Sequence, residues 1–422
     1  MVGLLLGLMF LLLAFNFPMI IPMVVAPLVV MIIYIPKVDI MLAVQQLIAG
    51  VNTQVLLAVP MFILGADIMS TGHSTNRLLD FIEAFVGHIR GGMAITTAAA
   101  CTLFGAISGS TQATVVAIGK PMRGRLLSLG YSDSASSGLI INSAIIALLI
   151  PPSISMIMYA VVTGSSVGNL FIAGVGPGIF MFLLFAIWSF FYANKVNIPK
   201  GEKKDWGERL SSLKRALGPL GFPMIIFIGI YGGFFSPTES AAVTVVYAFF
   251  LEFFIFNTLK LNDISRIALS TAVSTSVVFI LVAGGQLFSW VISYAQIPQM
   301  MTTAVLGTNP SALRILVTVT AFMLVACMFV DSLVAIIILS PIFYTVAMKA
   351  GINPIHLGIV ITLQAAMGSV TPPFGCNIFT GCAIFHRPYF DIIQGMPPYL
   401  IMELIVTVVV ILCPQLSLFL LK

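Results

Sequence analysis

The chain has 422 residues, of which 59% are hydrophobic and only 8% are charged, with a formal net charge of +5. Soluble domains carry about 25% charged residues, so this composition excludes a soluble globular protein and predicts one that crosses a membrane many times. The apolar runs are too long, and alternate too little with polar residues, to be barrel strands, which leaves helices as the spanning elements.

The first half is predicted to contain three spans, an amphipathic interfacial helix, a helical hairpin with a polar tip, a broken helix and a last span. In chain order these are Val2–Phe15, Met19–Ile35, Ile40–Ser70 with a kink near Pro60, the amphipathic stretch Thr71–Arg90, hairpin arms Gly91–Gly105 and Ala113–Met122, the broken helix Leu139–Val162 and the span Leu170–Phe191. The first arm, read as 91–107, has 17 residues. Because a crossing needs about 20 apolar residues, a re-entrant hairpin is favoured over two full crossings.

The second half repeats this plan after a charged loop. Its elements are the loop Lys195–Arg215, the spans Leu217–Phe234, Ala241–Leu259 and Ile267–Ile297, two arms around Met328–Ser332, the broken helix Leu357–Phe385 and the last region Tyr389–Leu421. The chain then divides into 1–73 (scaffold spans), 74–165 (amphipathic helix, hairpin and broken helix, a transport domain), 166–216 (last span and basic loop), 217–297 (spans of the second repeat), 298–388 (second hairpin and broken helix, again transport domain) and 389–422 (last span).

A shift of 221 positions superimposes the two halves without a gap over 48 residues. Pro151 and Pro152 then fall on Pro372 and Pro373, while Pro177 falls on Pro398. All three prolines of the first window match prolines of the second, which indicates a tandem repeat of about half the chain, as in many secondary transporters.

Each repeat interrupts a long apolar run with a Pro-Pro pair. Proline lacks the backbone N–H and restricts the residue before it, so the pair breaks the helix and removes partners from carbonyls four residues earlier. In hydrocarbon such a break persists where it lines a cavity or binds something. Two broken helices in corresponding places predict the binding site of a transporter, although simple proline kinks are the alternative reading.

Charge predicts how the repeats insert. Each repeat has five crossings, and because that number is odd, the second copy must be inverted. If the loop Lys195–Arg215 is cytoplasmic, 15 of the 19 basic residues lie inside, in accord with the positive-inside rule. Both termini are then predicted to lie outside.

The hairpin tips and the breaks supply candidate oxygen ligands for sodium, by analogy with other hard cations. The first predicted sodium site consists of Ser108, Gly109, Ser110, Ala147, Leu148 and Pro151. The second consists of Asp331, Ser332, Gly368, Ser369, Thr371 and Gly375. A carboxylate at membrane depth is expensive and indicates function, so Asp331 stands out, although it has the alternative role of a helix cap at the interface. The first tip has the alternative reading of a simple Gly-Ser turn.

Behind each Pro-Pro pair a half-helix begins, and its free N–H groups favour an anion. The predicted substrate contacts are Ser153, Ser155, Gly375 and Asn377. Ser236 to Glu239 is interpreted as a helix capping box, with Pro237 at the first helical position. Histidines and cysteines lack metal spacing and no catalytic motif is present, so an enzyme and a cofactor other than sodium ions are not expected.

At this point the motifs resemble a family. Phe104–Ser110, Ile150–Ile154, Leu170–Gly178, Phe235–Ala242 and Thr371–Gly375 are similar to the large membrane subunit of tripartite ATP-independent periplasmic (TRAP) transporters. The resemblance covers essentially the whole chain and is nearest to the unfused sialic-acid type, with C4-dicarboxylate members next. Phe374 and Cys376 depart from the smaller residues expected beside the second break.

The resemblance implies sodium-coupled import of a carboxylate by an elevator mechanism in the bacterial inner membrane. It implies as partners a small four-helix membrane subunit and a periplasmic substrate-binding protein, with no nucleic acid. The fold class is therefore an all-α polytopic membrane protein of two inverted repeats. The alternatives are a stand-alone divalent-anion/sodium symporter and, from another class, a channel or a structural membrane scaffold.

Overall fold

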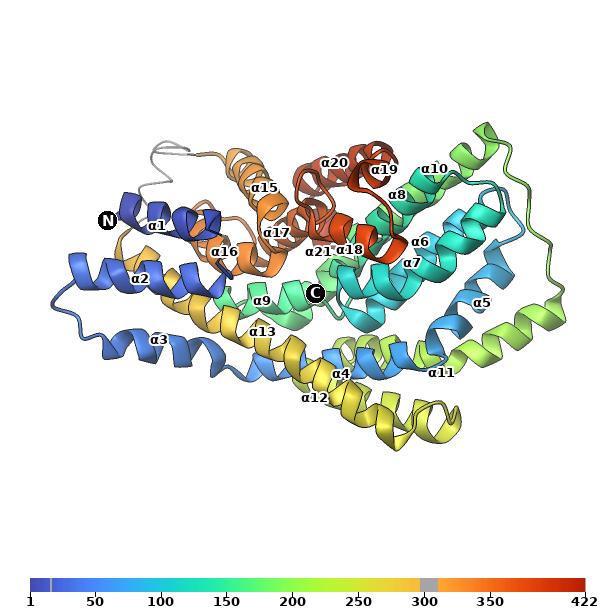
Figure 1. The fold of residues 1–422 in the computed structure, drawn as a ribbon, viewed down its shortest axis with the longest axis horizontal. Coiled ribbons are helices and arrows are strands. Elements are labelled where there is room, and N and C mark those ends of the chain that lie inside the picture. The colour runs from blue at the N-terminus through green and yellow to red at the C-terminus, as the bar shows by residue number, and fades with distance from the viewer. Residues whose placement is uncertain (16, 297–309, 422) are drawn as a thin grey trace.

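The computed structural model describes residues 1–15, 17–296 and 310–421, and every regular element within these ranges is a helix (Figure 1). Seven helical segments in these ranges are long and apolar enough to cross a membrane. The expected all-α membrane protein is thus confirmed at the level of fold class. The predicted span end Ile297, the start of segment 298–388 and the terminal Lys422 lie outside the described residues.

In the part of the first half that the structure describes, the chain forms ten α-helices. They are α1 (Val2–Ala14), α2 (Ile20–Tyr34), α3 (Met41–Val51), α4 (Ala58–Thr71), α5 (Ser74–Val86), α6 (Gly92–Ser108), α7 (Thr111–Ser128), α8 (Asp133–Ser143), α9 (Ile154–Thr163) and α10 (Val167–Lys195). Short 3₁₀ segments precede α4 at Gln54–Leu57 and follow α8 at Ala144–Leu148.

The second half forms a similar series. Its helices are α11 (Trp206–Tyr231), α12 (Pro237–Phe250), α13 (Leu261–Tyr294), α15 (Ala312–Phe329), α16 (Ser332–Lys349), α17 (Pro354–Gly368), α18 (Cys376–Phe385), α19 (Tyr389–Ile393), α20 (Pro397–Leu412) and α21 (Gln415–Leu418). A π-helical turn, Leu251–Ile255, extends α12.

Three predicted boundaries were wrong. The third span breaks at Asn52 and Thr53 and not at Pro60, because Pro60 lies in the first turn of α4, where the N–H groups have no intrahelical partner. The second part of the charged loop is helical, since Asp205 caps α11 in a capping box with Glu208. The last region contains three helices in place of one span.

The capping box predicted at the start of α12 is confirmed. Ser236 accepts a hydrogen bond from the backbone N–H of Glu239 (3.3 Å), and the Glu239 carboxylate accepts one from the N–H of Ser236 (2.8 Å). The amphipathic stretch is also helical, as α5, and it buries Leu78, Leu79 and Ile82 against α11 and α6.

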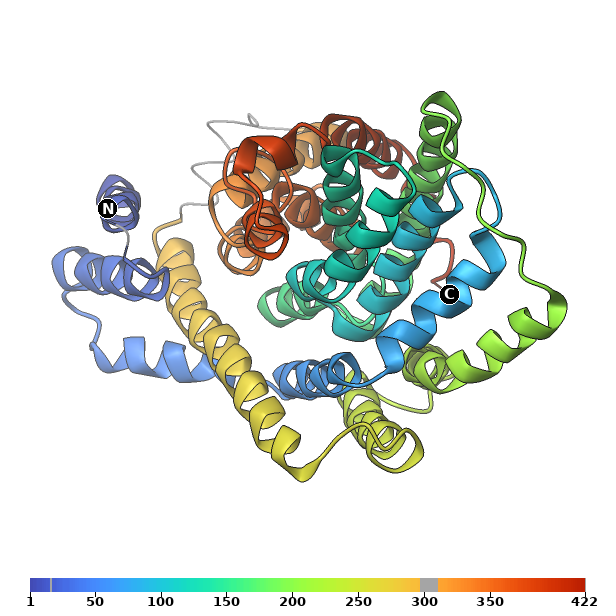
Figure 2. The same cartoon turned by 45° about the vertical axis from the view of Figure 1, so that its right-hand side comes forward.

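The helices form two groups. An outer group, α1–α5 and α11–α13, curves around one side of a central group, α6–α10 and α15–α21 (Figure 2). Within the outer group α13 packs on α2, α3 and α4, and α12 packs on α4. The groups meet where α13 contacts α16 and where α4 and α5 contact α6.

Element bounds correspond under the 221-residue shift. Moving α7 by 221 positions gives the bounds of α16, and moving α9 gives 375–384, one residue from those of α18. In the central group the corresponding elements cross over, because α7 packs on α18 while α16 packs on α9. Each hairpin therefore contacts the half-helix that follows the other half's break.

Candidate functional site

The first hairpin tip is a tight turn between α6 and α7. Gly109 joins the two helices in the left-handed region (φ +61°), and a Cβ there would lie 2.5 Å from the carbonyl oxygen of Pro152. Ser110 caps α7 by accepting from the N–H of Ala113 (3.4 Å), and the Ser108 hydroxyl lies 3.2 Å from that of Thr114. The tip is thus more than a loose Gly-Ser turn, since its glycine seats it against the first break.

The first break lies behind this tip. The Pro151–Pro152 bond is cis, and Ser153 caps α9 by accepting from the N–H of Met156 (3.3 Å). Proline has no N–H, so the carbonyls of Ala147 and Leu148 lose the partners that a continuing helix would supply. Both of these residues are buried, and a Cβ on Gly105 of α6 would lie 2.6 Å from Cα of Ala147. The structure therefore packs the first hairpin against the first break, and the sodium site between them stays a prediction.

The second hairpin tip contacts its own break in the same way. Ser332 donates a hydrogen bond to the Ala365 carbonyl of α17 (2.7 Å), and the rings of Phe329 and Phe374 lie 5.5 Å apart. Phe374, the aromatic residue that departs from the expected pattern, therefore contacts the tip while 54% of it stays exposed.

Asp331 has the role that was considered as its alternative. Its carboxylate caps α16, with Oδ1 accepting from the N–H of Leu333 at 2.9 Å, and the residue is exposed in this structure. A capping carboxylate keeps further lone pairs, so the cap does not exclude ion binding. The role of Asp331 in binding sodium therefore stays a prediction beside its observed role as a helix cap.

The expectation of free carbonyls at the second break was wrong. The carbonyl of Gly368 accepts from the N–H of Thr371 (3.2 Å), and that of Ser369 accepts from the N–H of Asn377 (3.0 Å). The N–H of Thr371, just before the prolines, closes a tight turn onto Gly368, and the N–H of Asn377 reaches Ser369 because the loop beyond the prolines folds back. Gly375 permits this fold, because a Cβ there would lie 2.6 Å from the Ser369 carbonyl oxygen.

The predicted substrate contacts are buried. Ser153, Ser155 and Asn377 are at most 1% exposed, and Gly375 is also buried. Within the described ranges, the Ser155 hydroxyl and the Asn377 amide nitrogen have no hydrogen-bonding partner. Unpaired buried polar atoms of this kind are costly, so a polar ligand that reached these two atoms would gain hydrogen bonds.

One contact that the sequence analysis missed joins the two halves. Thr111, the first residue of α7, donates a hydrogen bond to Oδ1 of Asn377 at the start of α18 (2.9 Å). Under the 221-residue shift Thr111 falls on Ser332, so both second arms begin with a hydroxyl that bonds to the second broken helix. This equivalence was visible in the sequence, but the partner of Thr111 was not.

A second link lies at the far ends of these helices. The Asp133 carboxylate at the start of α8 pairs with Arg123 of α7 and with Arg387, which follows α18, each at 2.6 Å. The link therefore joins parts of both halves.

Comparison with known proteins identifies relatives over the whole chain. The family model described as "Tripartite ATP-independent periplasmic transporter, DctM component" matches residues 6–416. The ectoine TRAP transporter large permease of Halomonas elongata is 53% identical, over 97% of this chain and 96% of its own. The ectoine/5-hydroxyectoine TRAP large permease of Ruegeria pomeroyi is 48% identical over 98% and 96%. The sialic acid TRAP large permease of Vibrio cholerae is 34% identical over 90% and 88%.

Among solved structures, the YdaH transporter of Alcanivorax borkumensis has a similar fold. Its TM-score is 0.58 at 16% identity, over 87% of this chain and 86% of that one. At that identity the similarity concerns the fold alone.

Proposed function

Because the chain belongs to the DctM family of TRAP transporter large permeases, we propose that it imports a small solute of the ectoine class. The observation that carries this proposal is the 53% identity to an ectoine permease over nearly the full length of both chains. The sialic-acid type expected from the sequence is not supported, since the sialic acid relative is only 34% identical. Ectoine bears one carboxylate and one delocalised cationic group, so the carboxylate-type substrate is retained in the proposal.

The proposed substrate position lies where the half-helices α9 and α18 begin. Their first N–H groups favour the carboxylate, and the unpaired Ser155 hydroxyl and Asn377 amide nitrogen supply hydrogen bonds. Because these atoms are buried, substrate entry requires the hairpin tips to separate from the breaks.

Sodium is proposed as the coupling ion. The first group of oxygens, around Ser108, Ser110 and the carbonyls of Ala147 and Leu148, is neutral and close-packed. The second group includes the only carboxylate at a tip, Asp331, and is more exposed. A carboxylate beside carbonyl and hydroxyl oxygens is the ligand chemistry that hard cations prefer.

The proposed movement is an elevator in the bacterial inner membrane. The central group carries both tips and both breaks, whereas the outer group carries neither, which supports central helices that move against an outer scaffold. The charge distribution supports inverted repeats with both termini in the periplasm. The proposed partners are a small membrane subunit on the outer group and a periplasmic binding protein, in keeping with the tripartite family.

Uptake in proteoliposomes tests the proposal. The permease and its small subunit are reconstituted and given labelled ectoine, with and without the binding protein and a sodium gradient. We expect saturable, sodium-dependent uptake that needs the binding protein and is not competed by sialic acid or a C4-dicarboxylate. Uptake without the binding protein would favour a stand-alone symporter, and flux that does not saturate would favour a channel. Competition by sialic acid would restore the sialic-acid assignment.

The role of Asp331 is tested by Asp331→Asn. Asparagine caps helices as well as aspartate does, so this change preserves the start of α16 and removes only the charge. Loss of a charged ligand costs about 1.5–3 kcal/mol, so we expect the half-saturating sodium concentration to rise about ten- to a hundredfold. Ser110→Ala removes one neutral ligand and should have a smaller effect. An unchanged sodium curve for Asp331→Asn would leave Asp331 as a cap alone.

A further inference from the structure

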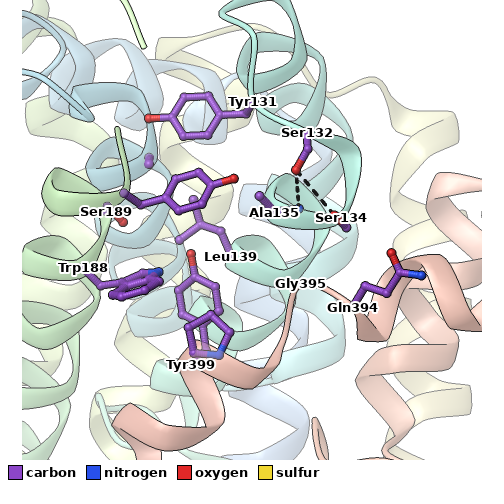
Figure 3. Close-up of a pocket in the computed structure, with 13 residues that line it drawn as sticks. Tyr131, Ser132, Ser134, Ala135, Leu139, Trp188, Ser189, Gln394, Gly395 and Tyr399 are labelled. Atoms are coloured by element: carbon purple, nitrogen blue, oxygen red, sulfur yellow. Dashed lines mark hydrogen bonds between the residues drawn. The ribbon is translucent and has the colours of Figure 1, made fainter. Parts of the chain in front are cut away.

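A cavity of about 150 Å³ lies away from both breaks, between the start of α8, the C-terminal part of α10 and the turn before α20. Its wall includes four aromatic side chains, Tyr131, Trp188, Tyr192 and Tyr399 (Figure 3). In the close-up Tyr131 and Tyr399 lie at opposite ends of the group, with Trp188 to one side and Ser132 on the other. Nothing in the proposed transport cycle uses this cavity.

Local structure holds the rings in place. Trp188 and Tyr192 are four residues apart on α10 and therefore share one face of the helix, with ring centroids 6.4 Å apart. Tyr192 stacks on Tyr131 at 6.2 Å with an interplanar angle of 19°, and Tyr399 packs edge-on against Phe185 at 5.2 Å. The cavity wall is thus set by contacts among α8, α10 and α20, and not by a single loop.

The polar atoms of the cavity indicate what it would bind. Tyr131 is only 5% exposed, and within the described ranges its buried hydroxyl has no hydrogen-bonding partner. The lining includes no acidic, basic or histidine side chain. A strongly hydrated metal ion and a lone anion therefore both lack a counter-charge, whereas aromatic faces attract weakly hydrated organic cations.

We propose that this cavity binds a small solute with a bulky or delocalised cationic group, and that the Tyr131 hydroxyl donates to a carboxylate on the same solute when one is present. Zwitterions that combine both groups match the lining best. The ring faces take the cationic part, and the unpaired Tyr131 hydroxyl faces the anionic part.

The position of the cavity suggests how a bound solute would affect transport. Tyr131 also lines a neighbouring cavity of about 280 Å³ beneath the basic loop 196–205, which is cytoplasmic in the proposed topology. A solute bound in the aromatic cavity would contact α8, which leads to the first break, together with α10 and α20. Solute accumulated in the cytoplasm would then slow further uptake. This second step rests on the proposed function, whereas the binding step does not.

Fluorescence of Trp188 tests binding directly in the purified complex. Trp206→Phe and Trp290→Phe make Trp188 the single tryptophan of the chain, and a complex whose small subunit has its own tryptophans replaced is used. The probes are tetramethylammonium chloride and ectoine, with sodium chloride and sodium acetate as ionic controls. We expect saturable changes with both probes and none with the controls.

Two variants locate the site. Tyr399→Leu should weaken both probes at least tenfold. Tyr131→Phe keeps the ring, so it should weaken ectoine several-fold and leave tetramethylammonium unchanged. Tyr34→Leu, a half-exposed tyrosine of the outer group, is the matched control and should change neither. Equal responses in Tyr399→Leu and in the control, or no saturation by either probe, would overturn the proposal. If Tyr399→Leu fails to assemble, an unchanged ectoine response in Tyr131→Phe overturns it.

The slowing of uptake by internal solute is tested separately, in proteoliposomes preloaded with ectoine. Initial uptake should fall at least threefold in the wild type and less in Tyr131→Phe. If tetramethylammonium binds but ectoine is not transported, the proposed function fails and the cavity assignment stands. If uptake occurs without any slowing, only the consequence of binding is refuted.

Discussion

The hydrogen bond between Thr111 and Asn377 offers the sharpest test of how the two halves are joined. Asn377 is fully buried and Thr111 is 6% exposed, and the bond is 2.9 Å long. Thr111→Val keeps the shape of the side chain and removes the donor. The amide nitrogen of Asn377 already has no partner. In Thr111→Val the amide oxygen would also lose the hydrogen bond that Thr111 donates to it.

The burial of this hydrogen bond sets the expected loss in the free energy of unfolding. A buried polar group left without its partner costs about 1–3 kcal/mol, whereas replacing both partners by apolar groups is nearly neutral. We therefore expect Thr111→Val to lower the free energy of unfolding by about 2 kcal/mol. Adding Asn377→Leu should recover part of that loss, so the double-mutant cycle should give a coupling of about 0.5–3 kcal/mol.

Reversible denaturation of the purified complex in mixed micelles measures these differences. Thr102→Val is the matched control, because its hydroxyl bonds only to the Ala98 carbonyl of its own helix (2.9 Å). That variant should stay within about 0.5 kcal/mol of the wild type. If Thr111→Val behaves like Thr102→Val, or if the two changes in the cycle simply add, the bond does not join the halves.

Three further outcomes are expected. In a background in which Cys376, Cys382 and Cys413 are serine, which leaves only the buried Cys101 and Cys327 of the native cysteines, a cysteine introduced at Lys203 or Lys260 should be labelled only from the cytoplasm. One introduced at Lys422 should be labelled only from the periplasm, and labelling of positions 203 and 422 from the same side would exclude inverted repeats. Gly109→Ala should abolish uptake, because its Cβ would lie 2.5 Å from the Pro152 carbonyl oxygen. Gly164→Ala is the control: it also has a positive φ (+71°) but nothing within 4 Å, so it should keep uptake and cost only about 1–2 kcal/mol of stability. Equal uptake by the two variants would show that the tip does not pack against the break. Asp133→Asn should weaken both of its arginine pairs, with Arg123 and Arg387, and speed cleavage by chymotrypsin after Phe390, three residues beyond Arg387. Asp263→Asn at the start of α13, which removes the pair with Arg266, is the control and should not change this cleavage.

The sequence predicted the elements around the breaks well, because proline, glycine and hydroxyl residues act through local backbone chemistry. Asp331 and the box at Ser236 were considered as caps, and they begin α16 and α12 in the structure. The cap Ser110 was not predicted, and α7 is longer than the predicted arm 113–122. The position of the third-span break was missed, since Pro60 was given the role of a kink that its place in the first turn of α4 does not require.

Contacts between distant parts of the chain could not be read in the same way. The carbonyls of Gly368 and Ser369 were expected to be free, because only the missing proline N–H groups were visible in the sequence. Thr371 reaches Gly368 through a tight turn, and Asn377 reaches Ser369 because the loop beyond the prolines folds back. The aromatic cavity was not predicted for a related reason. Trp188 and Tyr192 share one face of a helix, but nothing in the sequence indicates that Tyr131 and Tyr399 lie beside them.

The helix α5 limits how the two groups can move in the proposed elevator. Its carboxylate Glu83 pairs with Arg125 of α7 in the central group at 2.6 Å, whereas Ser74, at its other end, bonds to Glu252 of the outer group. A rigid displacement of the central group would break one of these contacts if α5 stayed whole and fixed. Gly72 precedes α5, and Gly91, in the left-handed region, follows it. In the proposed elevator these glycines would permit α5 to tilt about its outer end, so that this helix of the outer group would stay in contact with the central group.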